Sequence, residues 1–368
     1  MKISYKLEGT PNSPVLIFSN SLGAEMMMWD ELIPYLLPYF RVLRYNTNPL
    51  LFETSDVTVD DLGNQVISLM NDLNVDKAYF CGLSMGGLIG QSLAIHHESR
   101  FYKIAISNTA VKIGTIDTWN ERIQIVTNKG FDELSEMMME RWFTDDYRKY
   151  HTDRVNQIKE VFKKNDPELY IKNCKAIGNA DFTDHLSKIG IPVLVLTGDQ
   201  DPVTTVAQAE FLSDHIQQAE CKILPAKHLS GTELPLEFAS ALIDFFVGKN
   251  IDERGMHVRR TVLGNAHVDR SISNLNEFNQ DFQSFITRYA WGDVWSRPGL
   301  SKHDRSLITL AMLIALNRKD EFKMHIKAAL NNGVSKDVIK EVILQSALYC
   351  GLPAANEAIH SAQEIFNS

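Results

Sequence analysis

Cysteine is scarce in this chain, and its four cysteines lie far apart. Cys81, Cys174, Cys221 and Cys350 form no C-x-x-C pair, so a zinc knuckle and a dithiol motif are both excluded. No apolar run reaches the roughly 18 residues that a membrane-spanning helix needs. The N-terminus also lacks the apolar run of a secretory signal. We therefore expect a cytoplasmic protein with reduced thiols that does not bind a membrane.

Signatures of several ligand classes are missing as well. The chain has no Gly-rich phosphate loop, nucleotide fingerprint or metal-ligand cluster, so we expect neither a cofactor nor a metal. Its net charge is -9, and residues 251–368 hold 14 basic and 13 acidic side chains, which places the excess of acid in residues 1–250. Such an acidic domain is a poor partner for nucleic acid. An anionic substrate would need local arginines to bind it.

The 368 residues suffice for two domains, and the sequence pattern changes near residue 250. In residues 1–250, apolar strand-like runs such as PVLIFSNS (14–21) and IPVLVLTGD (191–199) alternate with helix-like segments. This alternation predicts an α/β domain with a parallel sheet covered on both faces. The stretch from about 112 to 185 is instead helical and rich in Met, Trp and charge, which predicts a cap over the sheet.

Residues 251–368 show a different, purely helical pattern. The segment NIDERG, near 249–255, is interpreted as the linker that leads into it. Beyond this segment the apolar positions recur at helical spacing, which predicts an all-α domain. Its clearest helices span 304–317, 320–333 and 335–351, and a last helix starts near Pro353.

The heptapeptide CGLSMGG (81–87) places a serine between an apolar strand and a helix. Gly82, Ser84 and Gly86 form a G-x-S-x-G motif, in which small residues permit a sharp turn that exposes the hydroxyl at the C-terminal edge of the sheet. The helix N-terminus behind the serine offers a partial positive charge. We interpret Ser84 as a nucleophile. A tight turn with an ordinary serine is the alternative.

A serine nucleophile needs a base and an acid, which follow it in the chain in the order Asp, His. Asp199 and Asp201 follow one late strand, and His228 follows the next. We predict Asp201 as the acid, because it lies further into its loop, and Asp199 as a loop-forming residue.

An oxyanion hole requires two N–H donors. One is expected from Met85, directly after the nucleophile. The other is expected from Leu22 in SNSLG (19–23), where small residues allow the backbone to approach a carbonyl oxygen closely.

The motifs GLSMGG, SNSLG, GDQDPVT and KHLSGTELP together resemble the α/β-hydrolase family. NSLG, MMMWDELIPYL and RWFT are more particular and resemble the 3-oxoadipate enol-lactonases. One departure is YNTNPL (45–50), where these enzymes have a glycine-rich D-x-R-G-H-G-like stretch. In the cap, Trp142 and Arg141 are candidates for substrate binding, with Arg141 holding a carboxylate. A structural salt bridge is the alternative for Arg141.

Glu321 and His325 are four residues apart and therefore share one face of their predicted helix. His325 borders the apolar stripe that includes Phe322 and Ile326. We interpret the two residues as a candidate functional pair. An exposed acid–histidine pair without a function is the alternative.

The helical region resembles 4-carboxymuconolactone decarboxylases over nearly all of 255–368, from WGDVWSRPGLSKHDRSL to YCGLPAANEA. It is also related to the alkyl hydroperoxidase D (AhpD) group. Arg318 and Glu321 stand where that group has its C-x-x-C cysteines, which excludes peroxidase chemistry. The resemblance implies cofactor-free decarboxylation. A histidine with a pKa near 7 can deliver a proton and a neighbouring carboxylate can tune it, and these are the roles that we predict for His325 and Glu321.

Arg297 and Arg305 are the best candidates for binding the two carboxylates of such a lactone. Trp295 could supply an apolar wall. Arg297 as a helix cap is the alternative, and His267 is a weaker site candidate.

The two resemblances imply two consecutive steps of the protocatechuate branch of the β-ketoadipate pathway, fused in reverse order along the chain. Small dicarboxylate lactones would be the substrates, and the helical domain would assemble the chain into a homo-oligomer. The competing hypothesis is a carboxylesterase of other specificity with a non-catalytic helical oligomerisation domain. Dehalogenases and epoxide hydrolases are disfavoured, because they use aspartate where Ser84 stands.

Overall fold

The computed structural model describes residues 3–52 and 56–367, which divide into two compact units. The first unit comprises Met1–Leu7, Val15–Ile33 and Val42–Leu242, and the second comprises Glu8–Pro14, Pro34–Arg41 and Ile243–Ser368. The second unit thus includes two N-terminal segments, although the predicted division at residue 250 assigns them to the first domain.

The first unit is built on a seven-stranded sheet with the strand order β1-β3-β2-β4-β5-β6-β7. Neighbouring strands from β2 to β7 along this order run parallel. β2 and β6 are buried along their whole length, as expected for strands covered on both faces. The α/β-hydrolase prediction is confirmed. The strands are β1 (Tyr5–Glu8), β2 (Val15–Ser19), β3 (Arg41–Tyr45), β4 (Ala78–Leu83), β5 (Phe101–Ser107), β6 (Val193–Gly198) and β7 (Ala219–Leu224).

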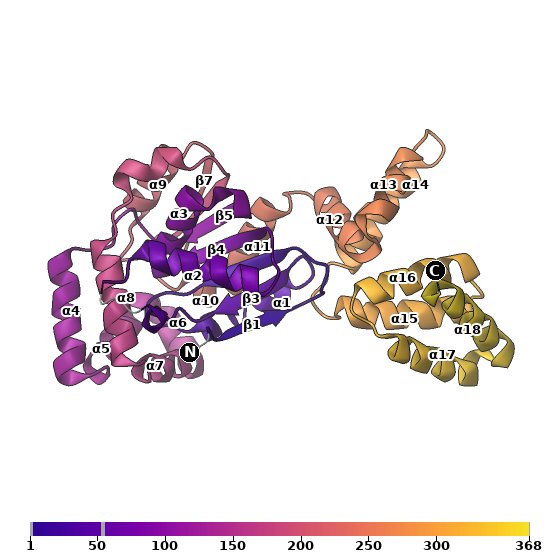
Figure 1. Cartoon of the computed structure of the whole chain (residues 1–368), viewed down its shortest axis with the longest axis horizontal. Helices are drawn as coiled ribbons and strands as arrows, with labels where there is room; N and C mark the ends of the chain where they lie inside the picture. Colours follow the sequence, from indigo (N-terminus) through magenta and orange to yellow (C-terminus); the bar gives the residue numbers. More distant parts are fainter. Residues whose placement is uncertain (1–2, 53–55, 368) are drawn as a thin grey trace. The chain divides into compact units, whose positions relative to one another are not determined.

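Five helices occupy most of the predicted cap span. Helices α4, α5 and α8 lie at one side of the first unit, with α4 packed against both others (Figure 1). These cap helices are α4 (Ile116–Lys129), α5 (Asp132–Trp142), α6 (Asp145–Tyr150), α7 (Thr152–Lys163) and α8 (Pro167–Asn179). The sheet is accompanied by α1 (Ile33–Leu36), α2 (Val59–Asp72), α3 (Met85–His96), α9 (Val206–His215), α10 (Ser230–Glu233) and α11 (Pro235–Phe246).

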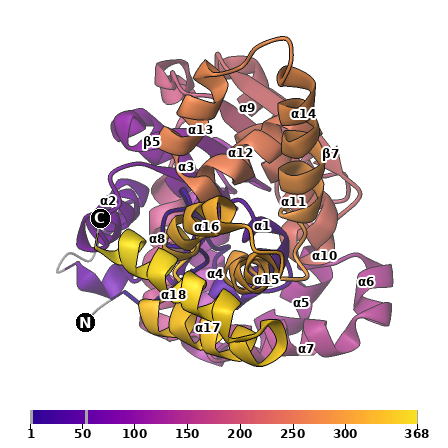
Figure 2. The same cartoon turned by 90° about the vertical axis from the view of Figure 1, so that its right-hand side faces the viewer.

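The second unit is helical, as predicted. Helices α15 to α18 pack against one another around one apolar core (Figures 1 and 2). The side chain of Ser335 caps α17 by accepting from Val338 N, and Gly333 and Gly351 adopt the positive φ angles of helix ends. The helices are α12 (Ile251–Leu263), α13 (Asn265–Ser273), α14 (Gln280–Phe285), α15 (Lys302–Ala315), α16 (Lys319–Asn331), α17 (Lys336–Cys350) and α18 (Leu352–Phe366). The π-helical segment η5 (Ile286–Val294) follows α14.

The predicted linker near 249–255 is wrong, because helix α12 begins at Ile251. Asn250 and Glu253 form a reciprocal capping box that starts the helix. Gly255 is required for packing, since a Cβ at this position would lie 2.1 Å from the Thr287 carbonyl oxygen. The polar NIDERG segment therefore encodes a helix start. Among the helices described, none has the length and apolar content needed to cross a membrane.

Candidate active sites

Ser84 lies in the sharp turn between β4 and α3. Its backbone adopts φ 59° and ψ -110°, a conformation that L-residues rarely adopt. The flanking glycines are needed, because a Cβ at Gly82 would lie 1.9 Å from Gly86 O and a Cβ at Gly86 would lie 2.3 Å from Ser19 O. The strained turn places the serine at the C-terminal end of β4, where the hydroxyl faces a cavity.

His228 and Asp201 form a buried pair beside this serine. His228 Nδ1 lies 2.8 Å from Asp201 Oδ2, and the Asp201 side chain is completely buried. Ser84 and His228 line the same cavity. Asp199 is exposed and makes no ion pair in the described part of the chain. The geometry therefore distinguishes the two aspartates that the sequence offers.

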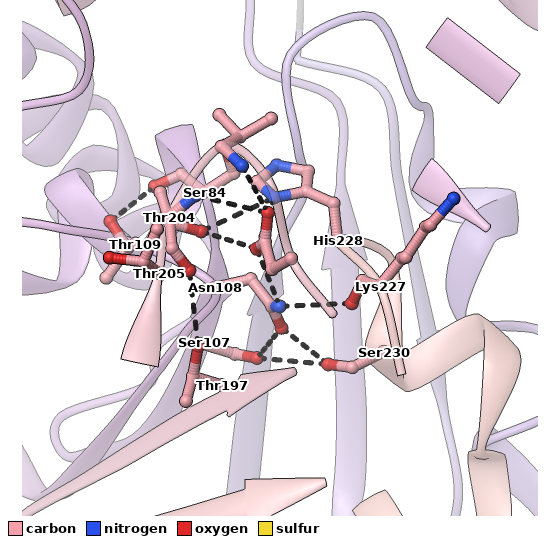
Figure 3. Close-up of polar contacts among 12 residues, drawn as sticks. Ser84, Ser107, Asn108, Thr109, Thr197, Thr204, Thr205, Lys227, His228 and Ser230 are labelled. Atoms are coloured by element: carbon pink, nitrogen blue, oxygen red, sulfur yellow. Dashed lines mark hydrogen bonds and ion pairs between the residues drawn. The ribbon is translucent and has the colours of Figure 1, made fainter. Parts of the chain in front are cut away.

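The carboxylate of Asp201 is held by several further donors (Figure 3). Thr204 Oγ1 and Asn108 Nδ2 donate to Oδ2 at 2.6 and 3.0 Å, and the N–H groups of Val203 and Thr204 donate to Oδ1. Burial opposes ionisation of this group, but His228, Thr204 and Asn108 outweigh burial and hold the Asp201 pKa far below its usual range. An ionised Asp201 fixes the proton of His228 on Nδ1 and leaves Nε2 free to accept one.

Two backbone N–H groups near Ser84 are available to an oxyanion. In the parts of the chain that the structure describes, neither Leu22 N nor Met85 N donates a hydrogen bond to protein. Leu22 lines the cavity of Ser84. The loop that carries it depends on Gly23, which has a φ of +78° and whose Cβ would lie 2.7 Å from the Phe162 ring.

The cavity above Ser84 has a volume of about 540 Å³ and is roofed by α4 and α5 of the cap. Trp142, predicted as a substrate-binding residue, is buried and lines it. The indole N–H of Trp119 donates to Ile113 O, so the ring is fixed and presents an apolar wall. The cavity is of the size typical for a small-molecule site.

Two arginines face this cavity, and neither has an acidic partner within the described residues. Arg141 was predicted from the sequence, whereas Arg122 was not. The Arg122 guanidinium lies 5.2 Å from the Trp119 ring centre and contacts Met138 Sδ. Burial and the charge of Arg122 lower the Arg141 pKa. Glu121 also lines the cavity, but within the described residues it forms no ion pair with either arginine, and two neighbouring unpaired guanidinium groups favour binding of an anion.

In the second unit, α16 carries Glu321 and His325. His325 is half-buried, and its Nδ1 is buried and has no hydrogen-bond partner among the described residues. Burial, and secondarily His267 of α13, lower the His325 pKa to about 4, while Glu321 acts in the opposite direction. Burial therefore places the His325 pKa below the value near 7 that favours proton delivery, so the imidazole of the ligand-free site is mostly neutral at neutral pH. His267, the weaker candidate, lies close enough to influence it.

Arg305 and Arg297 are neighbours at the start of α15. Arg305 Nη2 donates to Arg297 O at 3.2 Å, and burial together with Arg297 lowers the Arg305 pKa. Trp295 instead lies next to Trp291, with ring centres 5.0 Å apart. Within the described ranges, no hydrogen bond or ion pair connects Arg297, Arg305 or Trp295 to His325.

Comparison with known proteins divides the chain in the same way. The model of the carboxymuconolactone decarboxylase family matches residues 280–364, and the serine aminopeptidase S33 model matches residues 49–229. The chain is 38% identical to 3-oxoadipate enol-lactonase 2 of Acinetobacter baylyi over 65% of the chain and 91% of that protein. It is 60% identical to the 4-carboxymuconolactone decarboxylase of the same organism over 31% of the chain and 85% of that protein. The chain therefore belongs to the 3-oxoadipate enol-lactonases and to the 4-carboxymuconolactone decarboxylases.

The enol-lactonase part also has a close structural relative. The solved enol-lactonase from Burkholderia xenovorans LB400 superposes with a TM-score of 0.64 and 35% identity, over 66% of this chain and 96% of that one. At YNTNPL, where the sequence departs from the common pattern, Asn46 Oδ1 accepts from Asn20 Nδ2 and Met26 N. This segment therefore supports the loop that carries Leu22.

Arg122, Asn108 and Thr204 were not among the site residues predicted from the sequence. Arg122 lies three residues after Trp119, so both project from one face of α4. This spacing was the sequence signal that could have identified Arg122. Asn108 follows β5, and the pairing of β5 with β6 brings it near Asp201. No local motif marks Asn108.

Proposed function

We propose that this chain catalyses two consecutive reactions. The second unit decarboxylates 4-carboxymuconolactone to 3-oxoadipate enol-lactone, and the first unit hydrolyses that lactone to 3-oxoadipate, in the protocatechuate branch of the β-ketoadipate pathway. The observation that carries this proposal is the pair of relatives, which cover separate parts of the chain at 38% and 60% identity. The product of one named activity is the substrate of the other.

For hydrolysis, Ser84 is the nucleophile and His228 Nε2 accepts its proton. Asp201 orients the imidazole and stabilises its protonated form. The N–H groups of Leu22 and Met85 stabilise the oxyanion, which contributes roughly 3 kcal/mol per donor in comparable sites. His228 then returns the proton to the leaving enol oxygen, and water releases the acid in a second cycle.

The cap supplies specificity for an acidic lactone. The side-chain carboxylate of the substrate accepts hydrogen bonds from Arg141 and Arg122, and Trp142 and Trp119 enclose the ring. Support comes from the two unpaired guanidinium groups that face the cavity of Ser84. Binding the remote carboxylate orients the ester carbonyl toward the nucleophile.

For decarboxylation, CO₂ leaves and its bonding electrons enter the conjugated lactone as an enolate. Arg297 and Arg305 bind the substrate carboxylates, and Trp295 supplies an apolar wall. The negative charge of the substrate raises the His325 pKa from its low value in the ligand-free site, so that the imidazole takes up a proton and delivers it to carbon. Glu321 stabilises the protonated imidazole.

We also propose that the second unit assembles the chain into a homo-oligomer. Ile308 and Met312 of α15 and Leu316, which caps its C-terminus, follow one another at four-residue spacing and are 42%, 58% and 67% exposed. An apolar stripe of this kind favours contact with a second copy of the chain. A cytoplasmic location remains part of the proposal, in keeping with four free cysteines.

The test uses purified protein and 4-carboxymuconolactone, with CO₂ and 3-oxoadipate measured separately. Ser84→Ala should release CO₂ and accumulate the enol-lactone, whereas His325→Ala should hydrolyse added enol-lactone without releasing CO₂. Loss of both activities in either folded variant would contradict the two-site assignment. CO₂ release without 3-oxoadipate from unchanged protein would assign the serine site to another ester.

A further inference from the structure

A buried lysine without an acidic partner begins helix α15. Lys302 is 4% exposed, and its Nζ donates to Thr261 Oγ1 at 2.7 Å and to Ser13 Oγ at 3.3 Å. Within the described ranges, no carboxylate lies within ion-pair distance of it. Buried lysines are ordinarily paired with an acid. A helix N-terminus is also an unfavourable position for a cation, so both features favour an anion.

Asn332 is a second polar side chain that is buried in this region. It is 3% exposed, and its Oδ1 accepts no hydrogen bond from any residue that the structure describes. Its Nδ2 donates to Ser306 Oγ at 2.9 Å, and Ser306 Oγ donates to Lys302 O at 2.8 Å. This chain of bonds holds the amide beside the first turn of α15. A buried acceptor without a donor costs free energy on the order of 1–3 kcal/mol, which a ligand could recover.

Lys302 and Asn332 line one cavity of about 350 Å³ in the second unit. Its apolar walls include Trp295, Leu300 and Leu37. Neither His325 nor any residue of the Ser84 cavity lines it. The cavity therefore shares no residue with the Ser84 site. It shares Trp295 with the proposed decarboxylation site, but Arg297, Arg305 and His325 are not among its lining residues, and the inference does not depend on the proposed function.

We propose that this cavity binds a small organic carboxylate with a ring-sized apolar body and a hydroxyl group. The carboxylate accepts from Lys302 Nζ, the hydroxyl donates to Asn332 Oδ1, and the body packs against Trp295 and Leu300. The volume lies in the range of small-molecule sites. Burial lowers the Lys302 pKa to about 7, and a bound carboxylate would favour the charged ammonium.

The test is calorimetric titration of the full chain with 4-hydroxybenzoate as the probe. We expect saturable binding, and binding at least about tenfold weaker for 4-hydroxybenzamide, which lacks the charge, and for benzoate, which lacks the hydroxyl. This comparison needs no variant, so it remains decisive if a substitution impairs folding.

The variant Lys302→Met should abolish binding of 4-hydroxybenzoate, because it keeps an unbranched side chain that is one atom shorter and removes the charged ammonium group. Lys340→Met is the matched control, since Lys340 is an exposed lysine of α17 that makes no ion pair in the described part. No binding to unchanged protein, or equal binding by Lys302→Met, would overturn the proposal. Ser84→Ala and His325→Ala should bind the probe as the unchanged protein does, which separates this test from that of the catalytic sites.

Discussion

The Asp201 carboxylate lies 2.8 Å from His228 Nδ1, and both side chains are buried. Asp201→Asn would remove the charge that fixes the proton on Nδ1. We expect kcat for enol-lactone hydrolysis to fall by roughly 10⁴, with decarboxylation unchanged. Asp199→Asn is the control and should hydrolyse normally. Equal losses in the two variants would refute the assignment of Asp201.

The arginines of the cap should determine substrate affinity. Arg141→Met and Arg122→Met each remove a charge-assisted hydrogen bond to a carboxylate remote from the ester, so we expect a rise in KM of roughly 10- to 100-fold and a smaller change in kcat. Lys149→Met, at an exposed position of α6, is the control. If Arg141 were only structural, its variant would lose thermal stability and keep its KM.

Glu321 should act through His325. Glu321→Gln keeps the shape of the side chain but removes the charge that stabilises the protonated imidazole. We expect CO₂ release to fall on the order of 10²-fold, with the loss greatest at high pH, where protonation of His325 is hardest. Glu341→Gln, at an exposed position of α17, should have no effect. A loss that is the same at every pH would argue against this role.

Stability should fall in mild acid because of His257. Burial lowers its pKa to about 4, and its Nε2 donates to Tyr39 O. Between pH 6.5 and pH 4 the unfolded chain therefore binds more protons than the folded chain, so the free energy of unfolding decreases as the pH falls, by up to about 3 kcal/mol. His257→Gln should reduce this slope in urea unfolding at pH 7 and pH 5. His215→Gln, at an exposed position, should leave it unchanged.

The apolar stripe on α15 should mediate self-association. Met312→Glu places a charge at its centre, and we expect a smaller species by light scattering, with Ser84-dependent hydrolysis retained. Lys340→Glu introduces a glutamate outside the stripe, by reversing an existing charge, and serves as the control. An unchanged mass for Met312→Glu would place the interface elsewhere.

Local signals explain which parts of the two candidate sites could be predicted from the sequence. The turn at Ser84 depends on Gly82 and Gly86, which are close in sequence, and the pair Glu321–His325 follows from helix periodicity. Features that depend on tertiary packing could not be predicted. Asn108 reaches Asp201 only because β5 and β6 are neighbours, and the low pKa of His325 depends on burial.

The segment at 249–255 shows a different limit of prediction from sequence. Its polar composition resembles a linker, yet Asn250 and Glu253 cap a helix and Gly255 permits close packing against Thr287. Composition indicates exposure, and it does not distinguish a flexible connection from a helix start. The capping pattern, with Asn three residues before Glu, was the signal that could have been used.

The discontinuity of the second unit limits how the two activities can be separated. A polypeptide of residues 251–368 would lack Tyr39 O, the acceptor of His257, and Ser13 Oγ, a partner of Lys302. It would also lose Asn12, which donates to Asn331 O. Dividing the gene at the apparent junction would therefore yield an incomplete decarboxylase part, and inactivity of that fragment would reflect missing structure rather than missing chemistry. Point variants in the full chain are the appropriate way to assign each reaction to its site.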